Sequence, residues 1–238
     1  MKKPSHPDPV LLEQLQGLRL DHIAANAWEL AAGAAKANWS HLDYLAKLVE
    51  GQCHLRNDRA VARRIRGAKF PVIKTLEGFD WSWPKKINRA QIEHLFGLGF
   101  LKQNANVCFV GNVGVGKSHL ATALGYHACL QGATVLFTNT IAAINTLNAA
   151  VNDGGFKTAM KRYLRPSLLV LDELGYLPID GRGADLLFQI ISGRYESGST
   201  ILTTNRAFKD WPAIFNNDST LTSAVLDRLL HHAETVII

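Results

Sequence analysis

The sequence predicts an α/β fold with a parallel sheet, preceded by a small all-helical N-terminal domain. From Asn88 onward, short apolar runs alternate with helix-like stretches, which is typical of parallel strands that helices cover on both faces. Before that point, leucines and alanines recur at helical spacing across residues 8–70. With 238 residues, the chain is long enough for one full-sized α/β domain and a smaller attachment.

Composition excludes several classes of protein. Hydrophobic residues make up 47% of the chain and charged residues 19%, so we expect a buried core rather than wholesale disorder. No apolar run approaches the roughly 20 residues that span a bilayer, and the first lysines precede no hydrophobic stretch of a signal peptide. The cysteines are odd in number and far apart, which argues against a disulfide scaffold or a zinc site: Cys53, Cys108 and Cys129. We therefore expect a cytoplasmic protein with no membrane partner.

The expected N-terminal domain covers residues 1–70. Ser40 and Asp43 resemble a capping box that opens a long helix. Gly51 should weaken this helix without ending it. The end of the domain is predicted from Phe70-Pro71, because the residue before a proline is disfavoured in a helix.

A connector, residues 71–87, leads into the core, residues 88–238. In the core, helical patterns predict helices over residues 90–101, 118–130 and 221–230, the second of them amphipathic. Apolar runs predict strands over residues 107–110, 134–137, 168–171, 200–203 and 235–238. Because the sequence ends on the last of these runs, we expect a short tail to follow it.

The segment from Gly111 to Ser118 matches the phosphate-binding pattern G-x-x-x-x-G-K-[ST] at every fixed position. It follows a predicted strand and opens a predicted helix, which is the context that the pattern requires. Glycines let backbone N–H groups wrap the phosphates, and the helix N-terminus adds partial positive charge. Lys117 would reach the β- and γ-phosphates of ATP, and Ser118 would bind Mg²⁺. The expected nucleotide-binding residues are Gly111, Asn112, Val113, Gly114, Val115, Gly116, Lys117, Ser118 and His119.

Polar residues follow two of the predicted strands. Asp172 and Glu173 come directly after the apolar run 168–171, so we expect them beside the phosphate loop, at the carboxyl edge of the sheet. There Asp172 would hold Mg²⁺, mostly through water, and Glu173 would polarise the water that attacks the γ-phosphate. Asn205 follows the next strand and could orient that water or contact the γ-phosphate, although an asparagine in this position alone is usually part of a turn.

Positive charge is concentrated rather than spread. The net charge is +6, and residues 56–74 alone, with seven basic residues and one acid, account for +6. This pattern favours an anionic polymer as partner, with a solvated helix or a dock for an acidic partner as alternatives. A second cluster lies before the acids, where an ordinary solvated helix is the alternative. The candidate DNA contacts are Arg56, Arg59, Arg63, Arg64, Arg66 and Lys69, together with Lys157, Lys161, Arg162 and Arg165.

In order and spacing, the phosphate loop, Asp172-Glu173 and Asn205 resemble the Walker A, Walker B and sensor 1 motifs of AAA+ ATPases. Over residues 40–238, the chain more closely resembles the IstB-type transposition helper ATPases of bacterial insertion sequences, relatives of the helicase loader DnaC and the initiator DnaA. The Walker motifs specify only the superfamily. Two other segments are more specific to the helper family: Leu174-Gly-Tyr-Leu-Pro178 and Leu226-Asp-Arg-Leu-Leu-His-His232.

The resemblance implies an AAA+ P-loop NTPase core with no C-terminal lid domain. It also implies a Mg²⁺-dependent ATPase that forms an ATP- and DNA-promoted homo-oligomer on duplex DNA. Such a protein would assist a cognate transposase in target capture and insertion. In initiator-type relatives, an extra helix at the position of the second basic cluster lines the path of the DNA.

The resemblance also implies roles for individual residues. Arg228 matches an arginine finger, which would reach the γ-phosphate bound by a neighbouring subunit; a surface arginine paired with an acid is the alternative. Arg194 is a second finger candidate, for which a structural role is equally open. Phe79 and Asp80 match the start of the nucleotide-base pocket.

Two other functions stay open. A DnaC-like replicative helicase loader would use the same machinery on a different client. A non-catalytic, nucleotide-gated DNA-binding scaffold would bind ATP without turnover, whereas an intact Asp172-Glu173 pair predicts hydrolysis.

One pair of tryptophans and one pair of histidines are expected to take no part in DNA or metal binding. Trp81 and Trp83 should pack beneath the adenine or between domains rather than stack on bases. His231 and His232 could suggest a metal, but no carboxylate or cysteine is suitably spaced, so we expect a solvated pair.

Overall fold

The computed structural model describes residues 8–84 and 87–238. The chain forms two compact units, one that ends at Arg63 and one that runs from Arg64 to Ile238. The boundary lies inside one helix, α3 (His41–Ala68), rather than in a loop. None of the helices in the described part of the chain combines the length and the apolar character needed to cross a bilayer.

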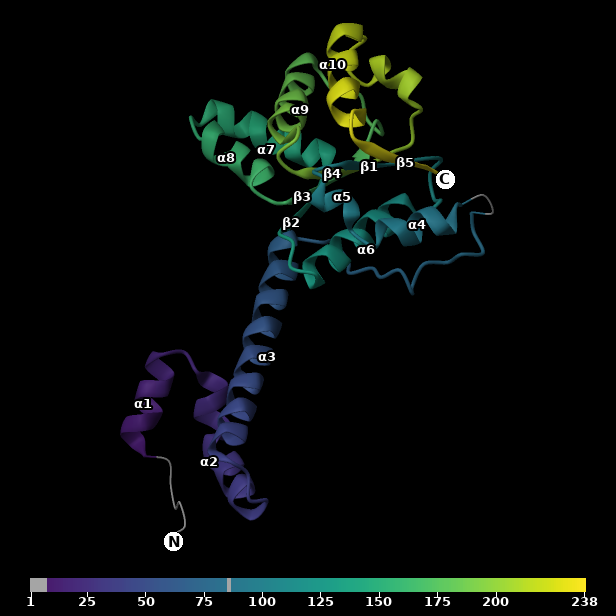
Figure 1. Cartoon of the computed structure of the whole chain (residues 1–238). Coiled ribbons are helices and arrows are strands. Elements are labelled where there is room, and N and C mark those ends of the chain that lie inside the picture. The colour runs from purple at the N-terminus through teal and green to yellow at the C-terminus, as the bar shows by residue number, and fades with distance from the viewer. Residues whose placement is uncertain (1–7, 85–86) are drawn as a thin grey trace. The chain divides into compact units, whose positions relative to one another are not determined.

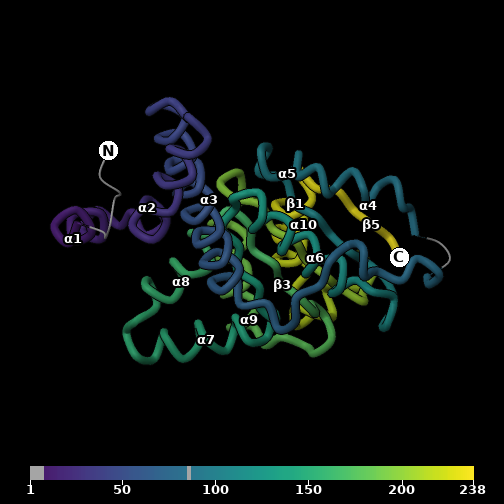
Figure 2. Tube along the Cα trace, turned by 90° about the horizontal axis from the view of Figure 1, so that it is seen from below, coloured from purple at the N-terminus to yellow at the C-terminus, as the bar shows by residue number. Residues whose placement is uncertain are grey.

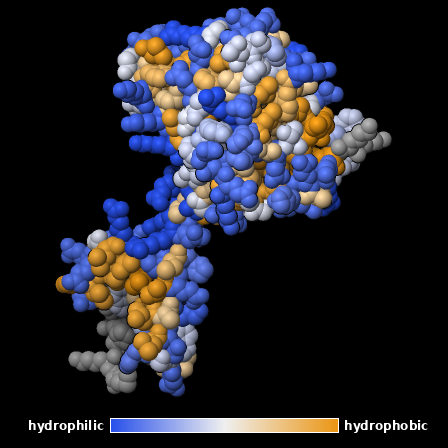
Figure 3. Space-filling model, turned by 45° about the horizontal axis from the view of Figure 1, so that its top comes forward, coloured by the Kyte–Doolittle hydropathy of each residue, from blue (hydrophilic) through white to orange (hydrophobic). Residues whose placement is uncertain are grey.

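The N-terminal unit is helical, as predicted. Helices α1 (Pro9–Gly17) and α2 (Asp21–Lys36) precede α3. The predicted capping box is present, since the Ser40 hydroxyl accepts from the Asp43 N–H at 3.1 Å and the Ser40 N–H donates to Asp43 Oδ2 at 3.3 Å. Apolar side chains gather on one face of this unit (Figure 3).

Helix α3 also continues through Gly51, as predicted. The position requires glycine for space, because an added Cβ would overlap the ring of His22 from α2. Glycine destabilises a helix, but at this position it allows α2 and α3 to approach closely.

The second unit contains a five-stranded sheet in the order β2-β3-β4-β1-β5, in which all neighbouring strands are parallel. Its strands lie where the apolar runs predicted them: β1 (Asn106–Val110), β2 (Val135–Asn139), β3 (Leu168–Leu174), β4 (Ser199–Thr204) and β5 (Ala233–Ile237). This confirms the predicted α/β class and the parallel sheet.

Helices cover both faces of the sheet (Figure 1). One face packs against α7 (Thr140–Asn152), α8 (Phe156–Leu164), α9 (Gly181–Arg194) and α10 (Ser219–Leu230). The other packs against α4 (Arg89–Leu95), α5 (Gly99–Lys102) and α6 (Lys117–Leu130), and α6 lies across the strands (Figure 2). A short 3-10 helix (Phe208–Ala213) joins β4 to α10. The central strands β1, β3 and β4 therefore bury both of their faces, which explains why they read as largely apolar runs, whereas the edge strand β5 is only partly buried.

Three details differ from the prediction. The helix expected over residues 90–101 is two helices, α4 and α5, because Leu98 adopts a left-handed conformation with φ 55°. Helix α6 is buried on most sides rather than amphipathic, since it lies between the sheet and the segments that precede it. Helices α7 and α9 were not predicted at all.

Arg194, at the end of α9, is buried and makes its hydrogen bonds inside the fold. Its side chain is only 2% exposed, and its guanidinium donates to five backbone carbonyls, most closely to those of Tyr163 (2.8 Å), Pro166 (2.9 Å) and Ser199 (2.6 Å). Burial lowers the pKa of the guanidinium to about 10. Arg194 thus joins α8, α9 and β4, and of the two roles left open for it the structural one is correct.

We expect Arg194→Met to destabilise the protein by about 3 kcal/mol or more, because a buried carbonyl left without its donor costs roughly 1–3 kcal/mol and at least the three closest carbonyls lose theirs. Urea unfolding measures the loss. Lys209→Met, at an exposed position, is the control and should change stability by no more than about 0.5 kcal/mol. Equal stability of the two variants would contradict the role given to Arg194.

Candidate nucleotide-binding and hydrolysis site

The phosphate loop connects β1 to the N-terminus of α6, as predicted. Gly114 and Gly116 have positive φ angles, 81° and 92°, which glycine adopts without strain. Gly116 is also pressed against the ring of Phe79, since an added Cβ would lie 2.6 Å from Phe79 Cε2. Both positions therefore need glycine for a positive φ angle, and Gly116 also needs it because a side chain would collide with Phe79.

Lys117 is the first residue of α6, and its charged side chain is only 4% exposed. Its Nζ donates to the carbonyl of Asn112 at 2.6 Å, so the ammonium reaches back over the loop. Burial lowers the pKa of Lys117, while the nearby carboxylates of Asp172 and Glu173 act in the opposite direction. A buried ammonium with a single hydrogen-bond partner among the described residues suits a site that takes up an anion.

The two residues predicted to hold Mg²⁺ are side by side. The hydroxyl of Ser118, on α6, donates to Asp172 Oδ1 at 2.8 Å, although 54 positions separate them in the sequence. Asp172 lies near the carboxyl end of β3 and is buried. A hydroxyl and a carboxylate are hard oxygen ligands of the kind that Mg²⁺ prefers, so the residues present fit this ion.

Glu173 follows in an unusual backbone conformation. Its φ is +62°, and the pairing of β3 with β4 shifts register between Leu171 and Leu174. Its carboxylate accepts from Asn139 Nδ2 at 2.6 Å, and its N–H donates to Thr203 Oγ1 at 2.9 Å. The predicted catalytic carboxylate is thus held by residues from both neighbouring strands.

Asn139 and Thr203 were missed by sequence reasoning. Asn139 ends β2 directly opposite Asp172 in the parallel pairing, and Thr203 lies on β4, on the other side of β3. The polar residues predicted from strand ends follow only the runs 168–171 and 200–203. A search after every predicted strand, including the run 134–137, would have found Asn139.

Asn205 follows β4 at the same edge of the sheet. Its Oδ1 is buried and has no hydrogen-bond partner within the described residues. Such orphaned acceptors are uncommon, and they are expected where a ligand or water completes the site. The lack of a described partner for Oδ1 therefore favours the predicted role of Asn205 in the site over the alternative of a simple turn residue.

The two residues expected in the base pocket differ in their surroundings. Phe79 is buried against the loop and makes edge contacts with Trp81 (5.0 Å between ring centroids) and His119 (5.4 Å). Asp80 is exposed and accepts from the N–H and hydroxyl of Ser82.

The expectation that both tryptophans pack holds only in part. Trp81 packs on Phe79 and beneath the guanidinium of Arg89, which lies 4.8 Å from its ring. Trp83 is 59% exposed, because its side chain lies outside this cluster.

Arg228 lies away from the phosphate loop of its own chain. The carbonyl of the next residue, Leu229, accepts from Asn106 Nδ2 at 2.9 Å, and Asn106 is the first residue of β1. The phosphate loop follows the last residue of β1, and five strand residues rise roughly 13 Å. The Arg228 guanidinium packs over Phe188 at 4.9 Å and has no carboxylate partner among the described residues, unlike the acid-paired arginine considered as the alternative.

The predicted DNA contacts are not equivalent. Arg59 forms an ion pair with Asp21 inside the N-terminal unit, and Arg64 Nε donates to the carbonyl of Cys129 at 2.9 Å inside the second unit. The remaining candidates are exposed and make no ion pair with a described residue: Arg56, Arg63, Arg66 and Lys69 on or after α3, and Lys157, Lys161, Arg162 and Arg165 on or after α8.

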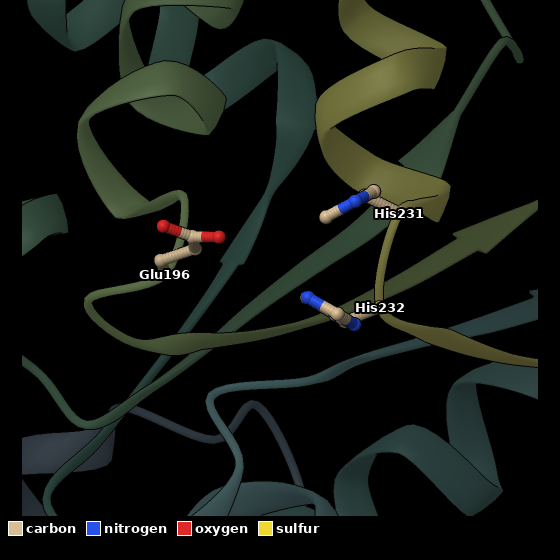
Figure 4. Close-up of side chains that lie close together, drawn as sticks. All are labelled: Glu196, His231 and His232. Carbon is tan, nitrogen blue, oxygen red and sulfur yellow. The ribbon is translucent and has the colours of Figure 1, made fainter.

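His231 and His232 are exposed, as expected for a solvated pair, but a carboxylate is close to them. Glu196, from the loop after α9, lies so near that its ligand atom and those of both imidazoles are within 4.8 Å of one another (Figure 4). The Tyr195 hydroxyl hydrogen-bonds His231 Nδ1 at 2.9 Å. Within the described residues the cluster offers three ligands and no fourth, so it lacks the closed shell of a structural zinc site.

Comparison with known proteins agrees with this geometry. A family model described as IstB-like ATP binding protein matches residues 13–238. The ATP-binding protein of insertion sequence IS21 from Pseudomonas aeruginosa is 37% identical over 222 residues, 93% of this chain and 83% of that protein. The corresponding protein of IS232 from Bacillus thuringiensis subsp. berliner is 36% identical over 228 residues, 96% of this chain and 91% of that protein.

Solved structures share the fold of about two thirds of the chain. The DnaC helicase loader is 26% identical with a TM-score of 0.53, covering 63% of this chain and 86% of that chain. DnaI is 17% identical with a TM-score of 0.60, covering 69% of this chain and 90% of that chain. The initiator DnaA, bound to AMPPCP and single-stranded DNA, is 22% identical with a TM-score of 0.56, covering 69% of this chain and 49% of that chain.

The sheet is therefore that of an AAA+ protein, with no lid domain among the described residues. The match over nearly the whole chain, together with relatives above 30% identity, shows that this protein belongs to the family of IstB-like ATP-binding proteins of insertion sequences.

Proposed function

We propose that this protein is an ATP-dependent DNA-binding transposition helper of the bacterial cytoplasm. It assembles on duplex DNA, hydrolyses ATP at subunit interfaces and assists a transposase in target capture and insertion. The observation that carries the ATPase part is the meeting of Ser118 with Asp172 at 2.8 Å, next to the buried ammonium of Lys117. The insertion-sequence relatives support the transposition part.

Binding of ATP would use side chains that are already in place. Lys117 would exchange its bond with the Asn112 carbonyl for the β- and γ-phosphate oxygens. Ser118 and Asp172 would hold Mg²⁺, which when bound neutralises charge on the phosphate oxygens. The complex of DnaA with AMPPCP supports this assignment at the level of the fold.

Hydrolysis needs a base and an oriented water. Glu173 would take the proton from the water as its oxygen attacks the γ-phosphorus and the bond to the ADP oxygen breaks. Asn205 Oδ1 has no partner among the residues that the structure describes, so it suits a hydrogen bond from that water. In the structure the Glu173 carboxylate accepts from Asn139 Nδ2 through Oε2, and its second oxygen can accept a hydrogen bond from the water.

The position of Arg228 favours action between subunits. Because it lies toward the edge of the sheet opposite the phosphate loop, it would reach a nucleotide bound by a neighbouring copy rather than its own. An arginine supplied in this way stabilises the charge of the transition state. A homo-oligomer is therefore part of the proposed function.

DNA is proposed as the polymer because two groups of exposed cations make no ion pair with a described residue. Four of them lie on or directly after α8: Lys157, Lys161, Arg162 and Arg165. Such side chains contact phosphates without reading sequence.

A DnaC-like helicase loader is the second candidate, favoured by the similarity to the DnaC structure. The relatives that match more of the chain at higher identity are insertion-sequence proteins, which favour the transposition role. A non-catalytic nucleotide-gated scaffold would bind ATP and show no turnover even with transposase and DNA present.

Lys117 and Glu173 should have separable roles. Lys117→Ala should weaken ATP binding, because the phosphates lose their main point charge. Glu173→Gln should keep ATP bound while slowing hydrolysis, because Asp172 remains. Titration with a fluorescent ATP analogue and a phosphate-release assay measure the two effects. An equal loss of ATP affinity in both variants would contradict this division.

Arg228→Ala should lower turnover by up to about 10³-fold and leave nucleotide affinity of the single subunit unchanged. Mixing decides whether it acts between subunits. A Glu173→Gln subunit keeps Arg228, so adding it to Arg228→Ala should restore part of the turnover. No recovery in oligomers shown to contain both variants would count against action in trans.

Replacing Arg56, Arg63 and Arg66 with Gln should weaken duplex binding uniformly across sequences. If all three contact phosphates, the slope of log affinity against log salt should flatten by about 2.7, since each contact contributes about 0.9. Basal turnover without DNA should persist. The control replaces three exposed lysines outside both clusters with Gln: Lys36, Lys102 and Lys209. If both triple variants have the same slope, the arginines on α3 do not contact the DNA. The basic residues on or after α8 are then the candidate DNA contacts.

A further inference from the structure

The side chain of Thr203 lies between the two acids that follow the apolar part of β3. It is fully buried on β4, and its hydroxyl donates to Asp172 Oδ1 at 2.5 Å. The same oxygen accepts from the N–H of Glu173 at 2.9 Å. A hydroxyl has one proton to donate and lone pairs to accept with, so both bonds form at once. One hydroxyl therefore links the carboxylate of one acid to the backbone of the next.

The backbone explains why such a link is needed. Strands β3 and β4 pair Leu171 with Leu202, and then Leu174 with Thr204, so β3 has an irregularity at the two acids. Glu173, with φ +62°, directs its N–H at a side chain instead of at a carbonyl of the ladder. A buried N–H without a partner is unfavourable, and the Thr203 hydroxyl takes the place of the missing carbonyl.

The other side-chain donors to the acids each reach one of the two residues. Ser118 donates to the same Asp172 oxygen, Oδ1, and Thr140 donates to the Asp172 backbone carbonyl at 2.9 Å. The Asn139 side-chain amide donates to the Glu173 carboxylate. Because both hydroxyl donors converge on Oδ1, Asp172 Oδ2 accepts no hydrogen bond from a described residue and stays available.

We propose that Thr203 is a positioning residue that sets the orientation of Asp172 and Glu173 together. It fixes the Asp172 carboxylate through Oδ1, and so presents Oδ2 to Mg²⁺ or to its bound waters. Through the Glu173 N–H it fixes the backbone from which the base projects. This inference rests on the proposed ATPase function and deepens it, since Thr203 itself touches no substrate.

The test compares Thr203→Val, which keeps the shape and removes the hydroxyl, with Thr203→Ser, which keeps the hydroxyl. Thr200→Val is the matched control, because Thr200 is buried on the same strand and its hydroxyl accepts from Arg194 Nε and from no other described residue. For each variant, affinity for a fluorescent ATP analogue is measured with Mg²⁺ and with EDTA. Turnover and urea unfolding are measured in parallel.

We expect Thr203→Val to bind the analogue in EDTA within about twofold of the parent, since Lys117 is intact. The gain in affinity on adding Mg²⁺ should fall by about 10–100-fold, the range for loss of a partner that orients a metal ligand. Turnover should fall at least as much. Thr203→Ser should recover both to within about threefold, and Thr200→Val should keep both.

Three results would overturn the proposal: an unchanged Mg²⁺ effect in folded Thr203→Val, no recovery in Thr203→Ser, or the same loss in Thr200→Val. If Thr203→Val does not fold, Thr203→Ala replaces it with the same expectations. Absence of turnover in the parent, with the Mg²⁺ effect lost in Thr203→Val, would refute the proposed hydrolysis and leave the role of Thr203 intact.

Discussion

A buried carboxylate, that of Asp172, is the constraint on which the site depends. A carboxylate removed from water is unfavourable unless donors surround it, and only 8% of Asp172 is exposed. The donors come from two different elements, Ser118 on α6 and Thr203 on β4. Satisfying this one charge therefore fixes the phosphate-loop helix, the acid turn and the neighbouring strand relative to one another within the second unit.

Strand order makes this convergence possible. In the sheet, β4 lies between β3, which carries the acids, and β1, which leads into the phosphate loop. Parallel strands place their carboxyl ends at one edge, so residues that follow or end each strand meet there. Asn205 and Thr203 on or after β4 thus lie between the two motifs that the sequence identifies.

The sequence predicted those parts of the site that follow a linear pattern. The phosphate loop, Asp172-Glu173 and all five strands could be located, because fixed spacing and apolar runs specify them. Asn139 and Thr203 could not, since their roles follow from which strands are neighbours and from the irregularity at Glu173. Similarly, the burial of α6 depends on the layers that pack around it, and helix periodicity does not report them.

The single chain holds its reactive groups in internal bonds. The Lys117 ammonium is bonded to the Asn112 carbonyl and the Glu173 carboxylate to Asn139. Net free energies of such bonds are about 0.5–3 kcal/mol, so phosphate, water and a partner subunit can replace them. Since Arg228 lies toward the opposite edge of the sheet, no internal rearrangement of side chains alone would bring it to the phosphate loop. Under the proposed function, nucleotide binding can release Lys117, whereas completing the site requires a second copy of the chain.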